Sequence, residues 1–160
     1  MYNGLSRLVD GAVGLPEVGA ERAFRVDGSE HAIYFEGVNV IVRSGAGSTE
    51  VVDGLGNIII GYDEDDKDGD SDDKSGSHNL IIGPYHTYSS YGAIVAGSNN
   101  TSLAPYGSVL GGEGSVVAGE MGVVLGGRGH DISEEAISAT VLGGVGAEAE
   151  QPVTIYQGGQ

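Results

Sequence analysis

The chain repeats a short apolar run that ends in glycine, and this repeat constrains its fold more than any other feature. Runs such as Ile-Val-Ala-Gly at 94–97 and Val-Leu-Gly at 109–111 recur along most of the sequence. Their closing glycines are 22, 14, 14, 15 and 17 residues apart: Gly61, Gly83, Gly97, Gly111, Gly126 and Gly143. Self-similarity at a nearly constant period is typical of a solenoid, in which each repeat stacks on its neighbours.

Each 14- or 15-residue unit also contains a second, weaker apolar run. Ser-Val-Leu-Gly at 108–111 is followed seven residues later by Ser-Val-Val-Ala-Gly at 115–119. Short β-branched runs bounded by Gly, Asn and Ser predict strands joined by tight turns. Glycine at the turns supplies the positive φ that other residues adopt only at a cost. We therefore predict an all-β fold, a parallel β-roll of about seven coils, with the six glycines above as structural turn residues.

The β-roll is predicted over residues 31–150, between two segments of different pattern. Residues 1–30 form an N-terminal attachment segment, in which Leu5, Leu8 and Val9 lie on a helical stripe that glycines weaken. That stripe predicts a short helical or irregular stretch, and residues 24–35 predict two strands around an Asp-Gly turn. Residues 151–160 hold one last strand, which we expect to cap the open end of the solenoid.

A coil this narrow buries only one or two aliphatic side chains per strand. Stacking alone would leave one apolar face exposed, and the simplest remedy is association of identical faces on an axis. We therefore predict a homo-oligomer.

The composition excludes several classes of partner and environment. The chain has 23 acidic residues against 7 basic ones, and the resulting net charge of −16 excludes nucleic acid as a partner. No apolar run is long enough for membrane insertion, no segment resembles a signal peptide, and the absence of cysteine excludes a disulfide framework.

The segment from Ser108 to Gly119, Ser-Val-Leu-Gly-Gly-Glu-Gly-Ser-Val-Val-Ala-Gly, resembles the YadA-like head repeats of trimeric autotransporter adhesins. The stretches 35–42, 57–62, 76–83 and 88–97 resemble a lead-in found before such repeats in bacterial surface and phage-like fibre proteins. The resemblance covers about residues 35–150. It implies a left-handed β-roll in a parallel homotrimer that is extracellular or carried on a virion or injection-type particle. It further implies attachment to a fibre, stalk or baseplate protein through the N-terminus, and a cell-surface glycan or protein as receptor.

The insertion at 62–76 is strongly acidic and has two interpretations. Oxygen ligands at alternate positions are what Ca²⁺ requires, and Gly69 allows a sharp turn. Against the EF-hand template, however, the twelfth position is Ser75 where a bidentate Glu belongs. The loop is therefore either a Ca²⁺ site or a solvated acidic loop. The candidate Ca²⁺ ligands are Glu64, Asp66, Asp68, Asp70 and Asp72.

Tyrosine and asparagine cluster in the middle coils. Tyrosine beside Asn and Ser is typical of binding surfaces, because it combines rigid contact area with adaptable hydrogen bonds. The alternative is that these tyrosines pack between protomers or cover the ends of the roll. The candidate receptor-binding residues are Tyr85, Tyr88, Tyr91, Tyr106, Asn99 and Asn100.

We predict a non-catalytic fibre or head module for structural display or adhesion. One alternative is an acyltransferase of the hexapeptide-repeat type, a trimer with a catalytic histidine between subunits, but its 18-residue coil differs from the spacing here. Another is a Ca²⁺-stabilised solenoid binding protein. No nucleophile elbow, phosphate loop or zinc motif occurs in the sequence.

Overall fold

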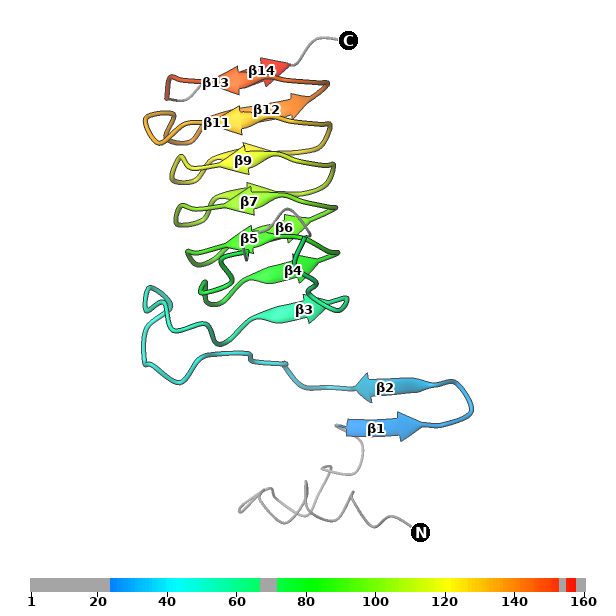
Figure 1. The fold of residues 1–160 in the computed structure, drawn as a ribbon. Helices are drawn as coiled ribbons and strands as arrows, with labels where there is room; N and C mark the ends of the chain where they lie inside the picture. The colour runs from blue at the N-terminus through cyan, green and yellow to red at the C-terminus, as the bar shows by residue number, and fades with distance from the viewer. Residues whose placement is uncertain (1–23, 67–71, 153–154, 158–160) are drawn as a thin grey trace. The chain divides into compact units, whose positions relative to one another are not determined.

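The computed structural model describes residues 24–66, 72–152 and 155–157 (Figure 1). The chain divides into two compact units, residues 1–41 and 42–160, and each is described by itself. The described residues contain no helix, so none that could cross a membrane. The predicted helical stripe near Leu5 lies outside the described residues.

The first unit contains an antiparallel hairpin. Strand β1 (Phe24–Asp27) pairs with β2 (Ala32–Phe35), with Asp27 opposite Ala32. The Asp27 carboxylate accepts hydrogen bonds from the Ser29 backbone N–H at 2.9 Å and the Ser29 hydroxyl at 2.6 Å. His31, at φ +53°, completes the reversal. The hairpin predicted at these residues is confirmed.

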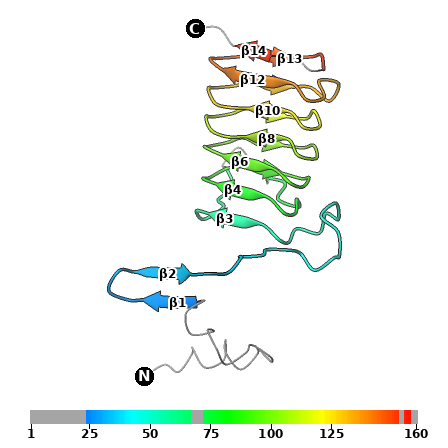
Figure 2. The ribbon, with the colours of Figure 1, turned by 180° about the vertical axis from the view of Figure 1, so that it is seen from behind.

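The second unit is a β-solenoid built from two parallel sheets (Figures 1 and 2). The larger sheet has seven strands, in the order β14-β12-β10-β8-β6-β4-β3. They are β3 (Ile58–Ile60), β4 (Leu80–Ile82), β6 (Ile94–Ala96), β8 (Ser108–Val109), β10 (Val123–Val124), β12 (Thr140–Gly143) and β14 (Ile155–Gln157). The smaller sheet has five: β5 (Thr87–Tyr88), β7 (Thr101–Ser102), β9 (Val116–Val117), β11 (Asp131–Ile132) and β13 (Glu148–Ala149). The predicted all-β parallel solenoid is confirmed, with about five complete turns in place of seven coils, since the smaller sheet has five strands.

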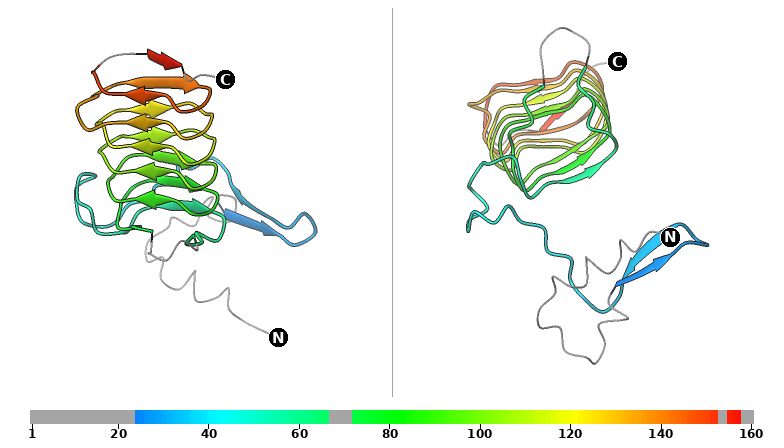
Figure 3. Two further views of the ribbon diagram at one scale, coloured as in Figure 1. Left: turned by 45° about the horizontal axis from the view of Figure 1, so that its top comes forward. Right: turned by 60° about the horizontal axis from the view of Figure 1, so that its bottom comes forward.

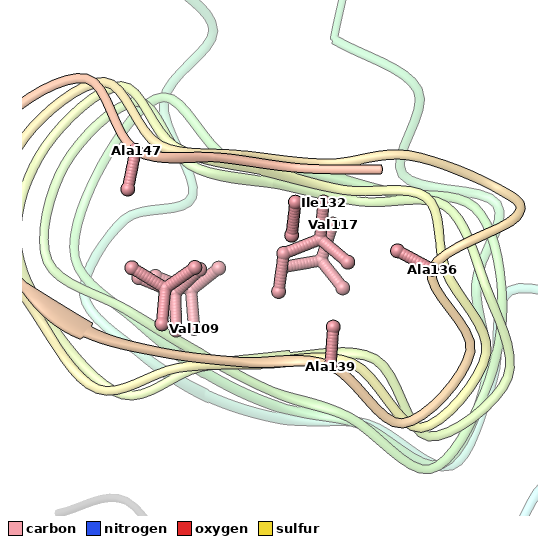
Figure 4. Close-up of a cluster of buried hydrophobic side chains, with 9 residues drawn as sticks. Val109, Val117, Ile132, Ala136, Ala139 and Ala147 are labelled. Atoms are coloured by element: carbon pink, nitrogen blue, oxygen red, sulfur yellow. The ribbon is translucent and has the colours of Figure 1, made fainter. Parts of the chain in front are cut away.

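Two columns of side chains fill the interior, one from each sheet. In the larger sheet the register stacks the inward residues Ile81, Val95, Val109, Val124 and Val141, all fully buried. In the smaller sheet the inward column is Tyr88, Ser102, Val117, Ile132 and Ala149. Figure 4 shows Val109 on one wall of the roll and Val117 and Ile132 on the other, pointing into a shared interior. Each fully buried aliphatic side chain contributes about 1.5–3 kcal/mol.

In the larger sheet, the turn after each strand from β3 to β12 is closed by a glycine of positive φ, but not always by the one predicted. Gly61, Gly83 and Gly97 have φ of +135°, +108° and +108°. Gly143 (φ +154°) is still part of β12, and the corner after that strand is Gly144 (φ +95°), which lies against Gly127. Gly111 and Gly126 have no positive φ, and the corner lies one residue later, at Gly112 (φ +92°) and Gly127 (φ +100°). The prediction differs there because the 15-residue coils add their extra residue between the strand and its corner.

The segments between the regular coils are less regular. Residues 37–57 contain no strand, and the border between the two units falls between Ile41 and Val42. The acidic insertion joins β3 to β4. At the other end, β14 continues the larger sheet, with Thr140 opposite Ile155.

Candidate functional site

The outward-pointing side chains of strands β3 to β12 in the larger sheet, as far as the structure describes them, carry no charge. Successive residues of a strand point to opposite faces, so the residues flanking the inward column face outward. Leu110, Leu125 and Leu142 are 44%, 43% and 48% exposed. We call this surface the outer apolar face; it comprises Ile58, Ile60, Leu80, Ile82, Ile94, Ala96, Ser108, Leu110, Val123, Leu125, Thr140 and Leu142.

The smaller sheet presents a different outer surface. Its outward positions include Thr87, Thr101, Asp131 and Glu148. Leu103, which follows β7, is a large aliphatic residue on this side and is 44% exposed. Charge is therefore segregated between the two sheets, although the chain as a whole carries a net charge of −16.

Comparison with known protein families, with curated proteins and with solved structures found no match to this chain.

A column of polar side chains runs inside one corner of the roll, and sequence reasoning missed it. The Asn100 backbone N–H donates to His86 Nδ1 at 3.1 Å, and the Ser115 N–H donates to Asn100 Oδ1 at 2.9 Å. The His130 N–H donates to Ser115 Oγ at 3.2 Å, and the Ala147 N–H donates to His130 Nδ1 at 3.0 Å. Each side chain thus satisfies a backbone donor of the next coil. The signal was available, because residues 86, 100, 115 and 130 follow the same 14–15-residue period as the glycines.

Asn100 shows why this polar column stabilises the interior. Its side chain is fully buried, and its amide nitrogen donates to the carbonyls of Ala96 at 2.8 Å and Gly112 at 3.1 Å. All its hydrogen-bonding groups are therefore used within the roll. At His130, by contrast, Nε2 is buried and has no partner among the described residues.

Two of the predicted receptor-binding residues are not on the surface. Tyr88 is 2% exposed and Asn100 is fully buried, so both serve the interior instead of a partner. The other four divide between two corners. Tyr85 and Asn99 occupy equivalent left-handed positions in successive coils, at φ +64° and +54°. At the other corner, Tyr91 and Tyr106 stack edge to face with their ring centroids 5.2 Å apart.

The acidic insertion is organised around Lys74. The Lys74 ammonium lies 2.6 Å from Asp65 Oδ1 and 3.6 Å from Asp63 Oδ1, and it donates a hydrogen bond to the Asp63 carbonyl. Burial opposes the charge of Lys74, but the hydrogen bond to Asp65 and the charge of Asp63 outweigh it and raise its pKa. The Tyr88 hydroxyl donates to Asp63 Oδ2 at 2.8 Å. Burial, reinforced by that hydrogen bond, raises the pKa of Tyr88 well above its usual range.

The predicted Ca²⁺ ligands are only partly described. Asp68 and Asp70 lie outside the described residues. Of the others, Asp72 accepts hydrogen bonds from the Asp66 backbone N–H at 3.2 Å and the Thr87 hydroxyl at 3.3 Å, while Glu64 is exposed. Within the described part of the insertion, the positive charge next to the carboxylates of Asp63 and Asp65 comes from Lys74. Ca²⁺ binding stays a prediction.

Residues 44–55 form hydrogen bonds with His78 and Ser77, which lie just before β4. His78 Nε2 accepts a hydrogen bond from the Ser44 backbone N–H at 3.0 Å, so Nδ1 carries the proton that is donated to the Thr49 carbonyl, 3.1 Å away. The neighbouring Ser77 hydroxyl oxygen accepts from the Asp53 backbone N–H at 2.8 Å and itself donates to the Asp53 carboxylate at 3.0 Å. We call this arrangement the His78 clamp.

The His78 clamp also lowers the pKa of a carboxyl group, that of Asp53. Burial tends to raise the pKa of Asp53, but hydrogen bonds from the Leu55 backbone N–H and the hydroxyls of Ser77 and Ser44 lower it overall. Asp53 therefore stabilises the clamp as a carboxylate.

Proposed function

We propose that the chain is a non-catalytic fibre or head module, a left-handed β-roll that assembles as a parallel homotrimer through its outer apolar face. The observation that carries the proposal is the absence of charge from that face in a chain with a net charge of −16. Monomeric proteins rarely expose a contiguous apolar patch larger than a few hundred Å². Six side chains of the outer apolar face, each between 40% and 57% exposed, leave on the order of 500 Å² of apolar surface.

The interior of the roll supports the same conclusion. Its inward columns contain Tyr88, Ser102 and Ala149 beside the aliphatic residues, so each coil buries little apolar surface in its interior. Burial of the outer apolar face in an assembly would add to that buried apolar surface. Association of identical faces on a rotation axis is the usual form of homo-oligomers. A trimer in which these faces meet would convert the exposed leucines into a second core.

The proposed role is mechanical display with receptor binding at the corners. Tyr106, 43% exposed, and the exposed Asn99 lie at different corners of the roll. Three copies of each would add avidity to weak contacts with a cell-surface glycan or protein. The N-terminal unit would attach the module to a fibre, stalk or baseplate protein of a bacterial surface, phage tail or injection-type particle.

The acyltransferase alternative gains nothing from the structure. It requires a histidine exposed between subunits, whereas His86 and His130 are buried inside the roll and bonded to backbone N–H groups. His78 forms the hydrogen bonds of its clamp. His31 is exposed, but it lies in the turn of the antiparallel hairpin and not in a coil of the solenoid.

Assembly is tested with a matched pair of variants. Leu110→Glu places a charge in the outer apolar face, and Leu103→Glu places the same charge at an equally exposed leucine on the other sheet. By sedimentation velocity at equal chain concentration, Leu110→Glu should dissociate the assembly and Leu103→Glu should leave it intact. Dissociation by both variants, or by neither, would refute this interface.

Receptor binding is tested on a glycan array with the fluorescently labelled protein. We expect binding that is lost in a Tyr85→Ala and Asn99→Ala double variant, or in Tyr106→Ala. Tyr62→Ala, at a tyrosine that is 91% exposed, serves as the control. Binding that persists unchanged in all these variants would exclude these corners as the contact.

A further inference from the structure

The two corners of the roll carry side chains at their positive-φ positions in only some coils. Each corner forms a continuous column along the stacked coils (Figure 3). At the first corner, which follows the strands of the larger sheet, this position is Tyr85, then Asn99, and then Gly114. At the second corner, which leads back into the larger sheet, Gly92 is followed one coil later by Tyr106 at φ +59°. A bulky residue at positive φ is uncommon and is often retained for function.

The second corner presents a rigid aromatic surface. The Tyr106 ring lies against Gly92, where a Cβ would be 2.7 Å from Cδ1 and 2.9 Å from Cε1 of that ring. The Tyr91 ring packs edge to face on it, with the centroids 5.2 Å apart, and the Tyr91 carbonyl accepts the Tyr106 backbone N–H at 2.9 Å. Tyr106 is nevertheless 43% exposed. A tyrosine that is already held in place loses little freedom when it binds a ligand.

The first corner supplies a free amide in the same coil. The Asn99 backbone N–H donates to the Pro84 carbonyl at 3.1 Å, which fixes the backbone of this corner. The Asn99 side chain is exposed, and its amide forms no hydrogen bond within the described part of the chain. It therefore offers donors and an acceptor to a ligand. Ligand sites are concave, whereas each corner of the roll is convex, so neither corner encloses a ligand by itself.

The symmetry of the proposed trimer brings the two corners together. In that trimer the outer apolar faces surround a three-fold axis that runs along the roll. The first corner lies where the strands of the larger sheet end, and the second corner lies where they begin. Rotation about the axis places the end of one larger sheet beside the beginning of the next, without shifting the copies along the axis. Asn99 and Tyr106 flank the same strand, β7, so Asn99 of one copy would meet Tyr106 of its neighbour at the same height.

The charge of these coils selects the class of ligand. Between residues 75 and 127 the sequence has no Lys or Arg, and Glu113 and Glu120 are its only acidic residues. Sialylated or sulfated glycans would find no basic partner here, and the net charge of the chain, −16, would repel them. The flat face of an uncharged sugar, by contrast, packs on a tyrosine ring, and its hydroxyls form hydrogen bonds with an amide.

We propose that adjacent copies form a composite site for an uncharged glycan, in which Tyr85 and Asn99 of one copy face Tyr91 and Tyr106 of the next. The inference rests on the proposed trimer and its receptor binding, and it adds that the site is incomplete within a single chain. Two convex corners side by side enclose a crevice, and the symmetry repeats that crevice around the trimer. Receptor binding then depends on assembly, because a separated chain keeps only half of each site.

Subunit mixing tests the composite site. The first-corner variant is Tyr85→Ala with Asn99→Ala, the second-corner variant is Tyr106→Ala, and neither should bind when it is refolded alone. The two chains are unfolded together, refolded as mixed trimers and applied at high concentration to an array of uncharged glycans printed beside sialylated and sulfated ones. In a mixed trimer one junction has both corners intact, so about a quarter of all junctions in the mixture are complete. Binding to the uncharged glycans should therefore reappear in the mixture.

Crosslinking locates the two corners without a ligand. The natural chain has no cysteine, so an Asn99→Cys chain carrying a mass tag can be refolded with an untagged Tyr106→Cys chain and treated with a short bismaleimide. We expect a tagged–untagged dimer as the main product on a denaturing gel. Asn99→Cys with Glu148→Cys, an exposed position of the smaller sheet in the last coil, is the control pair and should not crosslink.

Three results would overturn the composite site. The first is a mixture that binds no better than the separate variants, and the second is an assembly of trimer mass in which the Asn99→Cys and Tyr106→Cys chains do not crosslink. The third is a natural trimer that binds only charged glycans, only a protein, or nothing on the array. Native mass separates these results from failure of the proposed assembly. A trimer with any of these results contradicts the composite site alone, whereas a monomeric natural chain contradicts both.

Discussion

The stacking of glycines at one corner of the roll makes a sharp prediction about two neighbouring residues. Gly112 has φ +92°, and a Cβ there would lie under 3.0 Å from both the carbonyl oxygen and the nitrogen of Gly127 in the next coil. Gly111 has no positive φ, and its Cβ would meet nothing nearer than the Leu125 carbonyl oxygen at 3.9 Å. Gly112→Ala and Gly111→Ala therefore make the same chemical change at adjacent positions, in opposite surroundings.

The cost of Gly112→Ala has three parts. A non-glycine residue at positive φ costs about 1–2 kcal/mol, and forcing a methyl group into a packed site costs about 1–3 kcal/mol. The Gly127 carbonyl that would be displaced accepts the Glu113 N–H at 3.0 Å, and that hydrogen bond contributes about 1 kcal/mol. We expect Gly112→Ala to lower the free energy of unfolding by about 3–6 kcal/mol, a large part of a domain's total stability. Gly111→Ala should be neutral or stabilising by up to about 1 kcal/mol, because alanine restricts the unfolded chain.

The assay is chemical unfolding followed by far-UV circular dichroism. Both variants and the natural chain are compared at one chain concentration, because assembly shifts apparent stability by mass action. The denaturant midpoint of Gly112→Ala should fall clearly, and that of Gly111→Ala should stay or rise. Equal midpoints for the two variants, or a lower one for Gly111→Ala, would refute the assignment of the corner to Gly112.

Four further predictions concern buried or ionised groups. Asn100→Ala leaves the Ser115 N–H without its acceptor inside the roll, and unfolding should show a loss of about 2–4 kcal/mol; an unchanged midpoint would contradict the polar column. His130→Asn copies the residue found at the equivalent position 100, and its free energy of unfolding should stay within about 1 kcal/mol of the natural chain in thermal unfolding. His130→Ala should lose at least about 2 kcal/mol. Equal losses in the two variants would show that the acceptor for the Ala147 N–H is unimportant. Because the pKa of Asp53 is lowered in the folded state, its stabilisation is present above about pH 4 and lost as the pH falls further, so Asp53→Asn should flatten the acid limb of an unfolding-against-pH curve. Because the pKa of Tyr88 is raised in the folded state, its contribution to the free energy of unfolding is present below about pH 10 and lost as the pH rises above that. Tyr88→Phe should remove this alkaline dependence. A variant in which stability still falls with pH as steeply as in the natural chain would exclude Tyr88 as the source.

The sequence was sufficient to predict the solenoid, because the inward aliphatic residues and the corner glycines each recur at nearly the same period. Inward positions such as Val95 and Val109 recur one coil apart in the sequence. The corner glycine was harder to place, since Gly111 and Gly112 are adjacent and only the backbone geometry shows which of them has positive φ.

The candidate binding residues were less predictable, for a physical reason. In strands of two residues, such as β5, alternation cannot show which residue points inward. Tyr88 and Asn100 therefore resembled surface residues by type, although both face the interior. Their burial depends on partners in other coils, Asp63 and Ser115, which residue type alone does not identify. The column that links His86 to His130 was nevertheless detectable, because its period matches that of the glycines.

The proposed assembly is tested most directly by native mass spectrometry of the unmodified protein. The proposed homotrimer has a mass of three times 16.2 kDa, or about 49 kDa. This mass should persist on dilution to low micromolar concentration. A stable species of 16.2 kDa under those conditions would contradict the account, because the outer apolar face would then be exposed to water.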